Sequence, residues 1–290
     1  MKQIQRKPNW FKVSLSDGGG AEVKRMLNDL NLNTVCREAR CPNLGECFNR
    51  GTATFLILGD ICTRNCRFCA VESGIPLKPS PDEPQRVAEA VRRLKLRHCV
   101  ITGVNRDDLP LGGAEYYAET VKRVREMNPA VTIEVLPGDF SGSYEALKLL
   151  LDSAPDVFNH NLETVERLTP VVRDHRADYR RSLEMLKKAK EYSPTLLTKS
   201  GILSGLGEIL AEIIETLKDL RAVGCEGVTI GQYIPPSPEH FPVARYYHPD
   251  EFAEIERIAR ELGFTGVAAA PLVRSSYQAA DFFSGKNQIY

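Results

Sequence analysis

The sequence lacks any apolar run long enough to cross a bilayer. Its longest candidate, residues 53–58, is the size of a β-strand, whereas a transmembrane helix needs roughly 20 apolar residues. It also lacks an excess of either charge, because 38 Lys and Arg residues balance 38 Asp and Glu residues. Proteins that bind nucleic acid or a membrane surface carry a basic excess, so the composition argues against both classes.

The first residues, 1–8, are polar and basic, without the apolar segment and small-residue cleavage site of a secretory signal. We therefore expect a cytoplasmic protein in a reducing compartment, where disulfides are rare. Eight cysteines in that setting indicate metal binding or catalysis rather than a disulfide framework. Cys99 and Cys225 stand alone in apolar, strand-like segments, and we assign them only a role as small buried side chains.

The length of 290 residues suits one α/β barrel with short extensions. Strand-like runs alternate with segments of helical period, which predicts βαβ units and a parallel sheet. The predicted strands are 53–58, 98–102, 131–135, 156–158, 195–198 and 227–230, with a possible extra strand at 266–269. The predicted helices are 87–96, 114–127, 177–192, 208–223 and 250–262. No GxGxxG motif follows the first strand, which argues against a dinucleotide-binding sheet.

We therefore predict an α/β fold of the partial (β/α)6 TIM-type barrel class, with N-terminal and C-terminal extensions. The expected division is an N-terminal extension at 1–52, a barrel core at 53–235 and a C-terminal segment at 236–290 that closes the barrel. In such barrels the chemistry lies at the C-terminal ends of the strands.

The first informative motif is C-x3-C-x2-C at Cys62, Cys66 and Cys69, directly after the first predicted strand. Three thiolates so close in sequence can hold three corners of a four-iron cluster and leave one iron open. Structural zinc is the alternative, but it normally takes four ligands in two closely spaced pairs. No second pair of that kind follows here, so the motif favours the cluster.

The second motif is C-x4-C-x5-C at Cys36, Cys41 and Cys47, a short distance before Cys62. One interpretation is a zinc site that borrows a distant fourth ligand. The five histidines all lie well downstream, at positions 98, 160, 175, 240 and 248. The other interpretation is a second iron–sulfur cluster whose fourth ligand is not a cysteine.

The two motifs in this order resemble the lipoyl synthase family of the radical S-adenosylmethionine superfamily. Phe68, just before the last cysteine of the first motif, fits this resemblance. It extends over nearly the whole chain, through residues 6–10, 106–114, 159–164, 199–201, 231–233 and 274–277.

The resemblance implies an enzyme, a sulfurtransferase that inserts two sulfur atoms at carbons 6 and 8 of a protein-bound octanoyl-lysine. It implies two 4Fe-4S clusters and S-adenosylmethionine as cofactors. The cluster on Cys62, Cys66 and Cys69 would bind S-adenosylmethionine. The auxiliary cluster would donate sulfur, and its ligands would be Cys36, Cys41, Cys47 and Ser276. From the residues alone, an N-cap before a helix at 278–283 is the favoured explanation of Ser276; with the resemblance, the ligand is favoured.

The partners implied by the resemblance are octanoylated lipoyl carrier domains or proteins and an electron donor such as flavodoxin or ferredoxin. We expect no nucleic-acid or membrane partner. Asn161 and Glu163, just past the fourth predicted strand, are candidates to bind the amino-acid or ribose end of the cofactor. Lys199, placed after the fifth predicted strand, could meet a carboxylate. For all three residues, a role at a strand end or helix cap is the alternative.

Three further residues have open roles: Asp107 and Asp108 could start a helix or touch substrate, and Arg274 could pair with a carboxylate or form a surface ion pair. Other functions also stay open. They are a biotin-synthase-like or methylthio-transferring enzyme, a non-enzymatic iron–sulfur electron carrier and a zinc-binding structural protein. The position of the auxiliary cysteines directly before the radical motif favours the lipoyl synthase type.

Overall fold

The computed structural model describes residues 7–11, 21–38, 41, 43, 54–277, 279 and 282. One eight-stranded sheet dominates these residues, in the order β1-β2-β5-β6-β7-β8-β9-β10. Its strands are β1 (Asn33–Thr34), β2 (Thr54–Ile57), β5 (His98–Gly103), β6 (Thr132–Leu136), β7 (Val157–Asn159), β8 (Leu197–Ser204), β9 (Gly227–Gln232) and β10 (Gly266–Ala270). Two short strands, β3 (Ile61–Cys62) and β4 (Glu72–Ser73), pair beside it.

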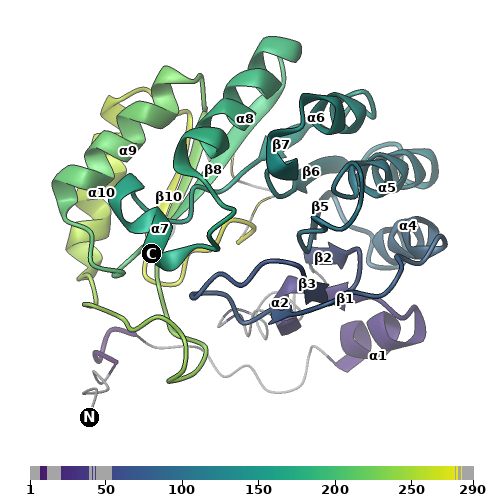
Figure 1. Ribbon diagram of the computed structural model, residues 1–290, viewed down its shortest axis with the longest axis horizontal. Helices are drawn as coiled ribbons and strands as arrows, with labels where there is room; N and C mark the ends of the chain where they lie inside the picture. The colour runs from purple at the N-terminus through teal and green to yellow at the C-terminus, as the bar shows by residue number, and fades with distance from the viewer. Residues whose placement is uncertain are drawn as a thin grey trace.

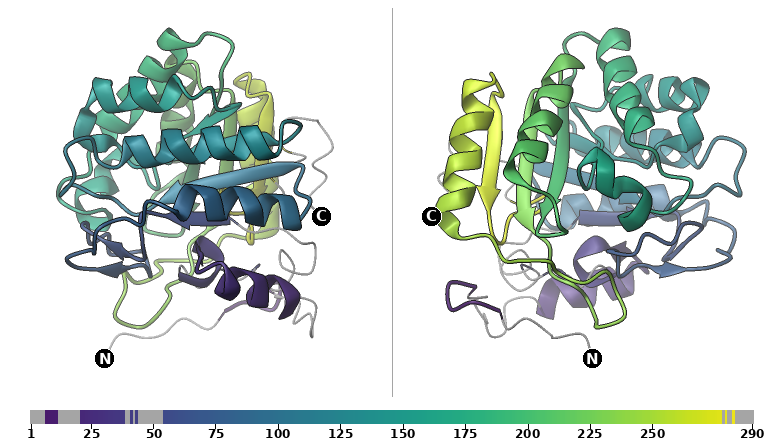
Figure 2. Two further views of the ribbon diagram at one scale, coloured as in Figure 1. Left: turned by 90° about the vertical axis from the view of Figure 1, so that its right-hand side faces the viewer. Right: turned by 60° about the vertical axis from the view of Figure 1, so that its left-hand side comes forward.

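Helices follow most of the strands and cover the outside of the curved sheet (Figures 1 and 2). The helices are α1 (Ala21–Asp29), α2 (Val35–Glu38), α4 (Glu83–Arg93), α5 (Ala114–Met127), α6 (Tyr144–Leu151), α7 (Thr169–Val172), α8 (Tyr179–Tyr192), α9 (Leu210–Ala222) and α10 (Pro249–Glu261). Two 3-10 turns, Phe140–Gly142 and Glu166–Leu168, precede α6 and α7. Within the described residues, no helix is long and apolar enough to cross a membrane.

The predicted partial barrel is confirmed. Every pairing from β2 to β10 is parallel, and only β1 runs antiparallel to its neighbour β2. Six strand–helix units are followed by β10, which is the possible extra strand of the sequence analysis. The strand order runs from β1 to β10 without closing, as far as the structure describes the chain. The proposed division at residues 52 and 235 stays a prediction.

Several elements differ from the sequence-based expectation, among them β8, α4 and α6. β8 extends to Ser204, well beyond the predicted end at 198, because the polar but fully buried residues Lys199 and Ser200 mask the strand pattern. Helix α4 begins four residues before the predicted start, with Pro84 in its first turn. Helix α6 was not predicted. It is capped by Ser143, whose hydroxyl accepts from the Ala146 N–H (3.2 Å), and its leucines fill the core.

An ion pair lies inside the barrel. Lys199 on β8 donates to Glu134 on β6 (Nζ to Oε1, 3.1 Å), and both side chains are almost completely buried. Asn159 also donates to Glu134 (2.7 Å), and His98 Nε2 lies 3.1 Å from its other oxygen. Burial opposes the charge of Glu134, but Lys199 and His98 hold the pKa of this carboxyl at about 2. The Lys199 ammonium also lies 4.3 Å from the centre of the Phe282 ring.

The buried pair generates a stability prediction. Lys199→Met should lower the free energy of unfolding by about 3–5 kcal/mol, because it leaves the Glu134 carboxylate buried without its cation. The double variant Glu134→Gln/Lys199→Met should recover much of that loss. Lys148→Met, which breaks an exposed pair with Asp152, serves as the control and should change stability little. Urea unfolding measures all three; equal stability of the Lys199 variant and wild type would contradict the prediction.

Candidate active site

The loop that holds Cys62, Cys66 and Cys69 leaves the barrel at the end of β2. Leu58 and Gly59 turn the chain there with positive φ angles of 72° and 97°. The buried carboxylate of Glu83 accepts the Leu58 N–H (2.7 Å), and Arg106 donates to the Leu58 carbonyl (3.2 Å). The chain then forms β3, which ends at Cys62, so the predicted position of the motif directly after the first barrel strand is confirmed.

The three thiols of this loop share one electrostatic site. Burial raises the pKa of Cys69 to about 12, with Cys66, Glu163 and Cys62 adding to the rise. Burial also raises the pKa of Cys66, and the charge of Arg173 opposes that rise. Burial disfavours the negatively charged thiolates, and a metal centre bound to them would supply the positive charge that stabilises them. Within the described residues, no three Cys, His, Asp or Glu side chains converge as ligands of a single metal ion.

Backbone N–H groups point at two of the thiols. The N–H groups of Asn105 and Arg64 donate to the Sγ of Cys62 (3.3 and 3.4 Å), and the N–H of Asp174 donates to the Sγ of Cys66 (3.3 Å). Hydrogen bonds of this kind surround the ligand sulfurs of iron–sulfur clusters, where they stabilise negative charge. The donor set therefore fits a thiolate-bound cluster.

The N-terminal cysteines lie on another side of the same cavity. Cys36 is buried in α2, and the Cys41 N–H donates to its carbonyl (3.2 Å). Burial raises the pKa of Cys36 to about 11. Burial raises the pKa of Cys41 too, and the Arg274 guanidinium opposes it. Cys47 lies outside the described residues.

One cavity of about 440 Å³ joins the two groups. Its lining includes the predicted site residues Cys36, Cys41, Cys69, Asn161, Glu163 and Ser276. Apolar side chains, among them Phe68, Ile202 and Leu203, form other parts of the wall. Residues from both ends of the chain and from the barrel thus face one space.

Asn161 and Glu163 lie just past β7, as predicted. Asn161 donates to Glu163 (Nδ2 to Oε1, 3.1 Å), and Glu163 holds a positive φ of 68° while its backbone bridges to Ile202 on β8. Burial raises the pKa of Glu163, and Arg173 opposes that rise. The pair therefore presents polar atoms and a partly compensated charge to the cavity.

The segment with Ser276 crosses the mouth of the barrel. Ser275 donates to Asn161 (2.9 Å). The segment passes so close to two strands that only glycine fits beneath it. A Cβ on Gly201 would lie 2.6 Å from the Ser275 hydroxyl, and one on Gly231 would lie 2.0 Å from the Val273 carbonyl. This close approach brings Ser276 to the cavity wall.

The structure shows the contacts of four residues whose roles were open, while a contact of Asp107 or Asp108 with substrate stays a prediction. Lys199 lies inside β8 and not after a strand, and the carboxylate it meets is the structural one of Glu134. Asp107 and Asp108 do not start a helix, because Gly113 caps α5; they bind Arg64 and Arg106 instead. Arg274 donates to the carbonyl of its own neighbour Val273 (2.6 Å). The helix expected at 278–283 falls largely outside the described residues.

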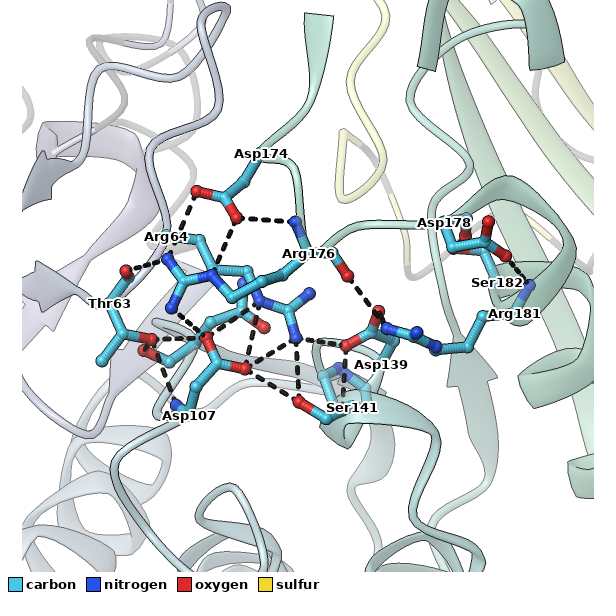
Figure 3. A network of polar contacts seen from close by, with 12 residues as sticks. Thr63, Arg64, Asp107, Asp139, Ser141, Asp174, Arg176, Asp178, Arg181 and Ser182 are labelled. Carbon is cyan, nitrogen blue, oxygen red and sulfur yellow. Dashed lines mark hydrogen bonds and ion pairs between the residues drawn. The ribbon is translucent and has the colours of Figure 1, made fainter. Parts of the chain in front are cut away.

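Sequence reasoning missed the arginines and aspartates around the cysteine loop. They come from three separate loops, which carry Arg64, Asp139, and the pair Asp174 and Arg176, and they meet only in the fold (Figure 3). The one signal in the sequence was the position of Arg64 between the first two cysteines of the motif. Arg173 was missed as well; it is buried and donates to Ser182 (3.0 Å) while its charge acts on Cys66 and Glu163.

Comparison with known proteins identifies the family. Residues 56–220, more than half of the chain, match the model of the radical SAM superfamily. A lipoyl synthase of Halalkalibacterium halodurans is 55% identical over 280 residues, which cover 96% of this chain and 92% of that protein. The lipoyl synthase of Caldanaerobacter subterraneus is 54% identical over 274 residues, 94% of this chain and 96% of that one. The chain belongs to the lipoyl synthase family.

Solved structures agree on the fold of this lipoyl synthase family member. The FeFe-hydrogenase maturase HydG from Carboxydothermus hydrogenoformans is similar with a TM-score of 0.60 at 19% identity, over 73% of this chain and 52% of that chain. Methylornithine synthase is similar with a TM-score of 0.53 at 15% identity, over 66% and 55% of the two chains. Family membership makes the chain an enzyme and sets aside the zinc-binding structural protein and the electron carrier.

A buried histidine beside the site predicts how stability depends on pH. His160 follows β7, is 2% exposed, and places Nδ1 3.1 Å from the Pro137 carbonyl. Burial lowers the pKa of His160 from 6.5 to about 4, with Arg173 adding to the effect. The fold therefore favours the neutral ring, so the contribution of His160 to stability is complete above pH 6.5 and is lost as pH falls towards 4.

Between pH 7.5 and pH 5, this group alone should remove about 2 kcal/mol from the free energy of unfolding, since each pKa unit corresponds to about 1.4 kcal/mol. In His160→Gln that part of the pH dependence should disappear. His175→Gln, which alters an exposed ring, should retain it. Urea unfolding at the two pH values measures the difference, and an unchanged pH dependence in His160→Gln would refute the assignment.

Proposed function

We propose that this enzyme inserts two sulfur atoms at carbons 6 and 8 of an octanoyl chain carried on a protein lysine, giving the lipoyl group. The observation that carries the proposal is the shared cavity. Cys69 of the first motif, Cys36 and Cys41 of the second, and Ser276 all line the same space of about 440 Å³. A substrate chain in that space could reach a radical source and a sulfur source without leaving.

In this proposal Cys62, Cys66 and Cys69 hold one 4Fe-4S cluster, which leaves an iron open for S-adenosylmethionine. Cys36, Cys41, Cys47 and Ser276 hold the auxiliary 4Fe-4S cluster. The bound groups supply a carbon radical able to take unactivated hydrogen atoms and the sulfide that replaces them. A serine oxygen is a hard ligand and a poor match for this iron, so this ligand can leave the iron readily.

In this proposal, side chains at the cavity wall bind and orient S-adenosylmethionine and the octanoyl chain. Asn161 and Glu163 offer an amide and a carboxylate at the cavity wall, suited to the amino group or ribose hydroxyls of S-adenosylmethionine. The apolar wall at Phe68, Ile202 and Leu203 suits an eight-carbon chain and keeps water from the reacting carbons.

The partners follow from the same chemistry. The substrate arrives on an octanoylated lipoyl carrier domain or protein, whose lysine arm is long enough to reach a barrel mouth. The electron comes from a donor such as flavodoxin or ferredoxin. Residues Asn65, Arg67 and Glu72 of the radical loop are exposed, so a docked donor can approach the cluster site. The seven described cysteines are free, which suits a reducing cytoplasm.

The division of labour between the two motifs can be tested by metal and product analysis. Anaerobically reconstituted wild type should hold about eight irons per chain. Replacing Cys62, Cys66 and Cys69 by alanine should halve the iron and abolish cleavage of S-adenosylmethionine. Replacing Cys36, Cys41 and Cys47 should also halve the iron, yet 5′-deoxyadenosine should still form while no thiolated product appears.

The assay uses an octanoylated carrier domain, with free octanoate as the control, and detects product by mass. Free octanoate should give no product because it lacks the amide and the carrier contacts that position the reacting carbons. Zinc in place of iron in the wild type would overturn the proposal, and so would equal turnover of octanoate.

The proposed ligand role of Ser276 is tested by comparing alanine variants of Ser276 and Ser275. Ser276→Ala should keep the iron of the radical cluster and lose most sulfur insertion, because the auxiliary cluster loses its fourth ligand. Ser275→Ala removes the same group one residue earlier and breaks only a hydrogen bond to Asn161, so it should keep both clusters. Were Ser276 only a helix cap, its loss would cost about 1 kcal/mol of stability and leave activity intact. Iron content and product yield of the two variants separate the roles.

A further inference from the structure

Arg64 is a buried cation inside the cysteine loop. It stands between Cys62 and Cys66 and is 4% exposed. Its guanidinium donates to Asp107 (Nη2 to Oδ1, 2.7 Å; Nε to Oδ2, 3.0 Å) and to Asp139 (Nη2 to Oδ1, 2.6 Å), as Figure 3 shows. Asp107 follows β5 and Asp139 follows β6. One side chain therefore ties the loop to the ends of two barrel strands.

The surrounding charges balance. Arg176 Nη1 lies 3.3 Å from Asp107, and Arg181 Nη1 lies 3.4 Å from Asp139. Arg176 also pairs with Asp174 (2.9 Å) and donates to the Thr63 carbonyl inside the loop. Three arginines thus meet three aspartates. Such a connected group of charge-assisted hydrogen bonds is stiff, because each carboxylate is held from more than one side.

The same aspartate-bearing loops carry the N–H groups that face the thiols. Asn105, whose N–H donates to Cys62, also accepts the Thr63 N–H (3.0 Å). The Thr63 hydroxyl donates to Asp107 (2.7 Å). On the other side, Asp174 donates its N–H to Cys66 and accepts the Asn65 N–H on its carboxylate (2.7 Å). The positions of both N–H donors are therefore coupled to the position of Arg64.

We infer that Arg64 is a positioning residue for the radical cluster: it holds the cysteine loop in its ligating shape before the cluster binds, and it keeps the N–H donors of Asn105 and Asp174 on Cys62 and Cys66. Hydrogen bonds to ligand sulfurs raise the reduction potential of a cluster, because they stabilise the added electron. Arg64 thereby acts on the electron-transfer step without touching S-adenosylmethionine. The effect on the loop is independent of the proposed function, whereas the effect on the potential rests on it.

The effect on the loop is tested without metal. Hydrogen–deuterium exchange of the cluster-free protein reports the amides of Thr63, Asn65 and Arg67, which donate to Asn105, Asp174 and Val172. In Arg64→Gln these amides should exchange about tenfold faster or more, while the barrel strands keep their protection. Arg180 lies on α8 and pairs at the surface with Glu166 and Asp219; Arg180→Gln is the matched control and should leave the loop unchanged.

Equal exchange in Arg64→Gln and wild type would overturn the inference. So would a uniform increase over all strands, since it would make Arg64 a general stabilising residue. If Arg64→Gln does not fold, Asp139→Asn takes its place, because it weakens the same contact while keeping the side-chain shape. Asp139→Asn should also speed the exchange of the Thr63, Asn65 and Arg67 amides.

The effect on the cluster is tested by redox titration followed by electron paramagnetic resonance. The parent protein has Cys36, Cys41 and Cys47 replaced by alanine, so that the radical cluster gives the only four-iron signal. Arg64→Gln should shift the midpoint to lower potential. For this one-electron step, a tenfold smaller equilibrium constant for reduction of the cluster corresponds to a shift of about 59 mV. Arg64→Lys keeps the charge but loses the forked contact with the carboxylates. Its midpoint potential should lie between those of the parent protein and of Arg64→Gln.

An unchanged potential together with unchanged iron retention in Arg64→Gln would refute the positioning role. A parent protein that binds no iron would instead refute the proposed cluster site, while the exchange result on the loop would still stand.

Discussion

The site depends on one interaction, the contact of the buried Arg64 guanidinium with Asp107 and Asp139. Between β3 and β4 the chain has almost no regular backbone pairing, since those strands are two residues each. A ladder of backbone hydrogen bonds cannot therefore define the shape of the cysteine loop. Single backbone hydrogen bonds, such as that from the Thr63 N–H to the Asn105 carbonyl (3.0 Å), share this task with side-chain contacts to the neighbouring strand ends. Among these side-chain contacts, a buried cation with two carboxylates is a strong one. The cost of desolvating these charges is offset only when all partners are in place, which makes the arrangement specific.

A second buried ion pair stabilises the interior of the barrel. The centre of the barrel holds polar as well as aliphatic side chains. Glu134 and Lys199 occupy that centre as a pair, and Asn159 and His98 complete the hydrogen bonds of the carboxylate. Above them the C-terminal segment covers the cavity, which is possible because Gly201 and Gly231 leave room for its backbone. Polar contacts thus stabilise the barrel interior and attach the segment Val273–Ser276, while apolar residues line part of the cavity wall.

The sequence predicted the repeated strand–helix units but not the side chains that meet only in the fold. Strand–helix alternation and an apolar pattern fixed the barrel class, and α5 matches its predicted range to the residue. β8 was cut short because Lys199 and Ser200 are polar, although both are fully buried. Periodicity carries no information on such residues, because their burial is decided by partners on other strands. For the same reason the sequence did not reveal the partners of Arg64: Asp107 and Asp139 are 43 and 75 residues away in sequence.

The two groups of predicted ligands differ in how they are assembled, and the difference matches the chemistry proposed for them. Cys62, Cys66 and Cys69 lie within eight residues and are positioned by a dense local network, as a centre that must survive many turnovers requires. The N-terminal cysteines and Ser276 lie at opposite ends of the chain, and long-range contacts such as Asn43 to the Leu272 carbonyl (2.7 Å) bring those ends together. Contacts between residues so far apart in sequence form late in folding. A centre that gives up sulfur and is then rebuilt needs ligands that can separate while the barrel stays folded, and a site closed by the two ends of the chain allows this.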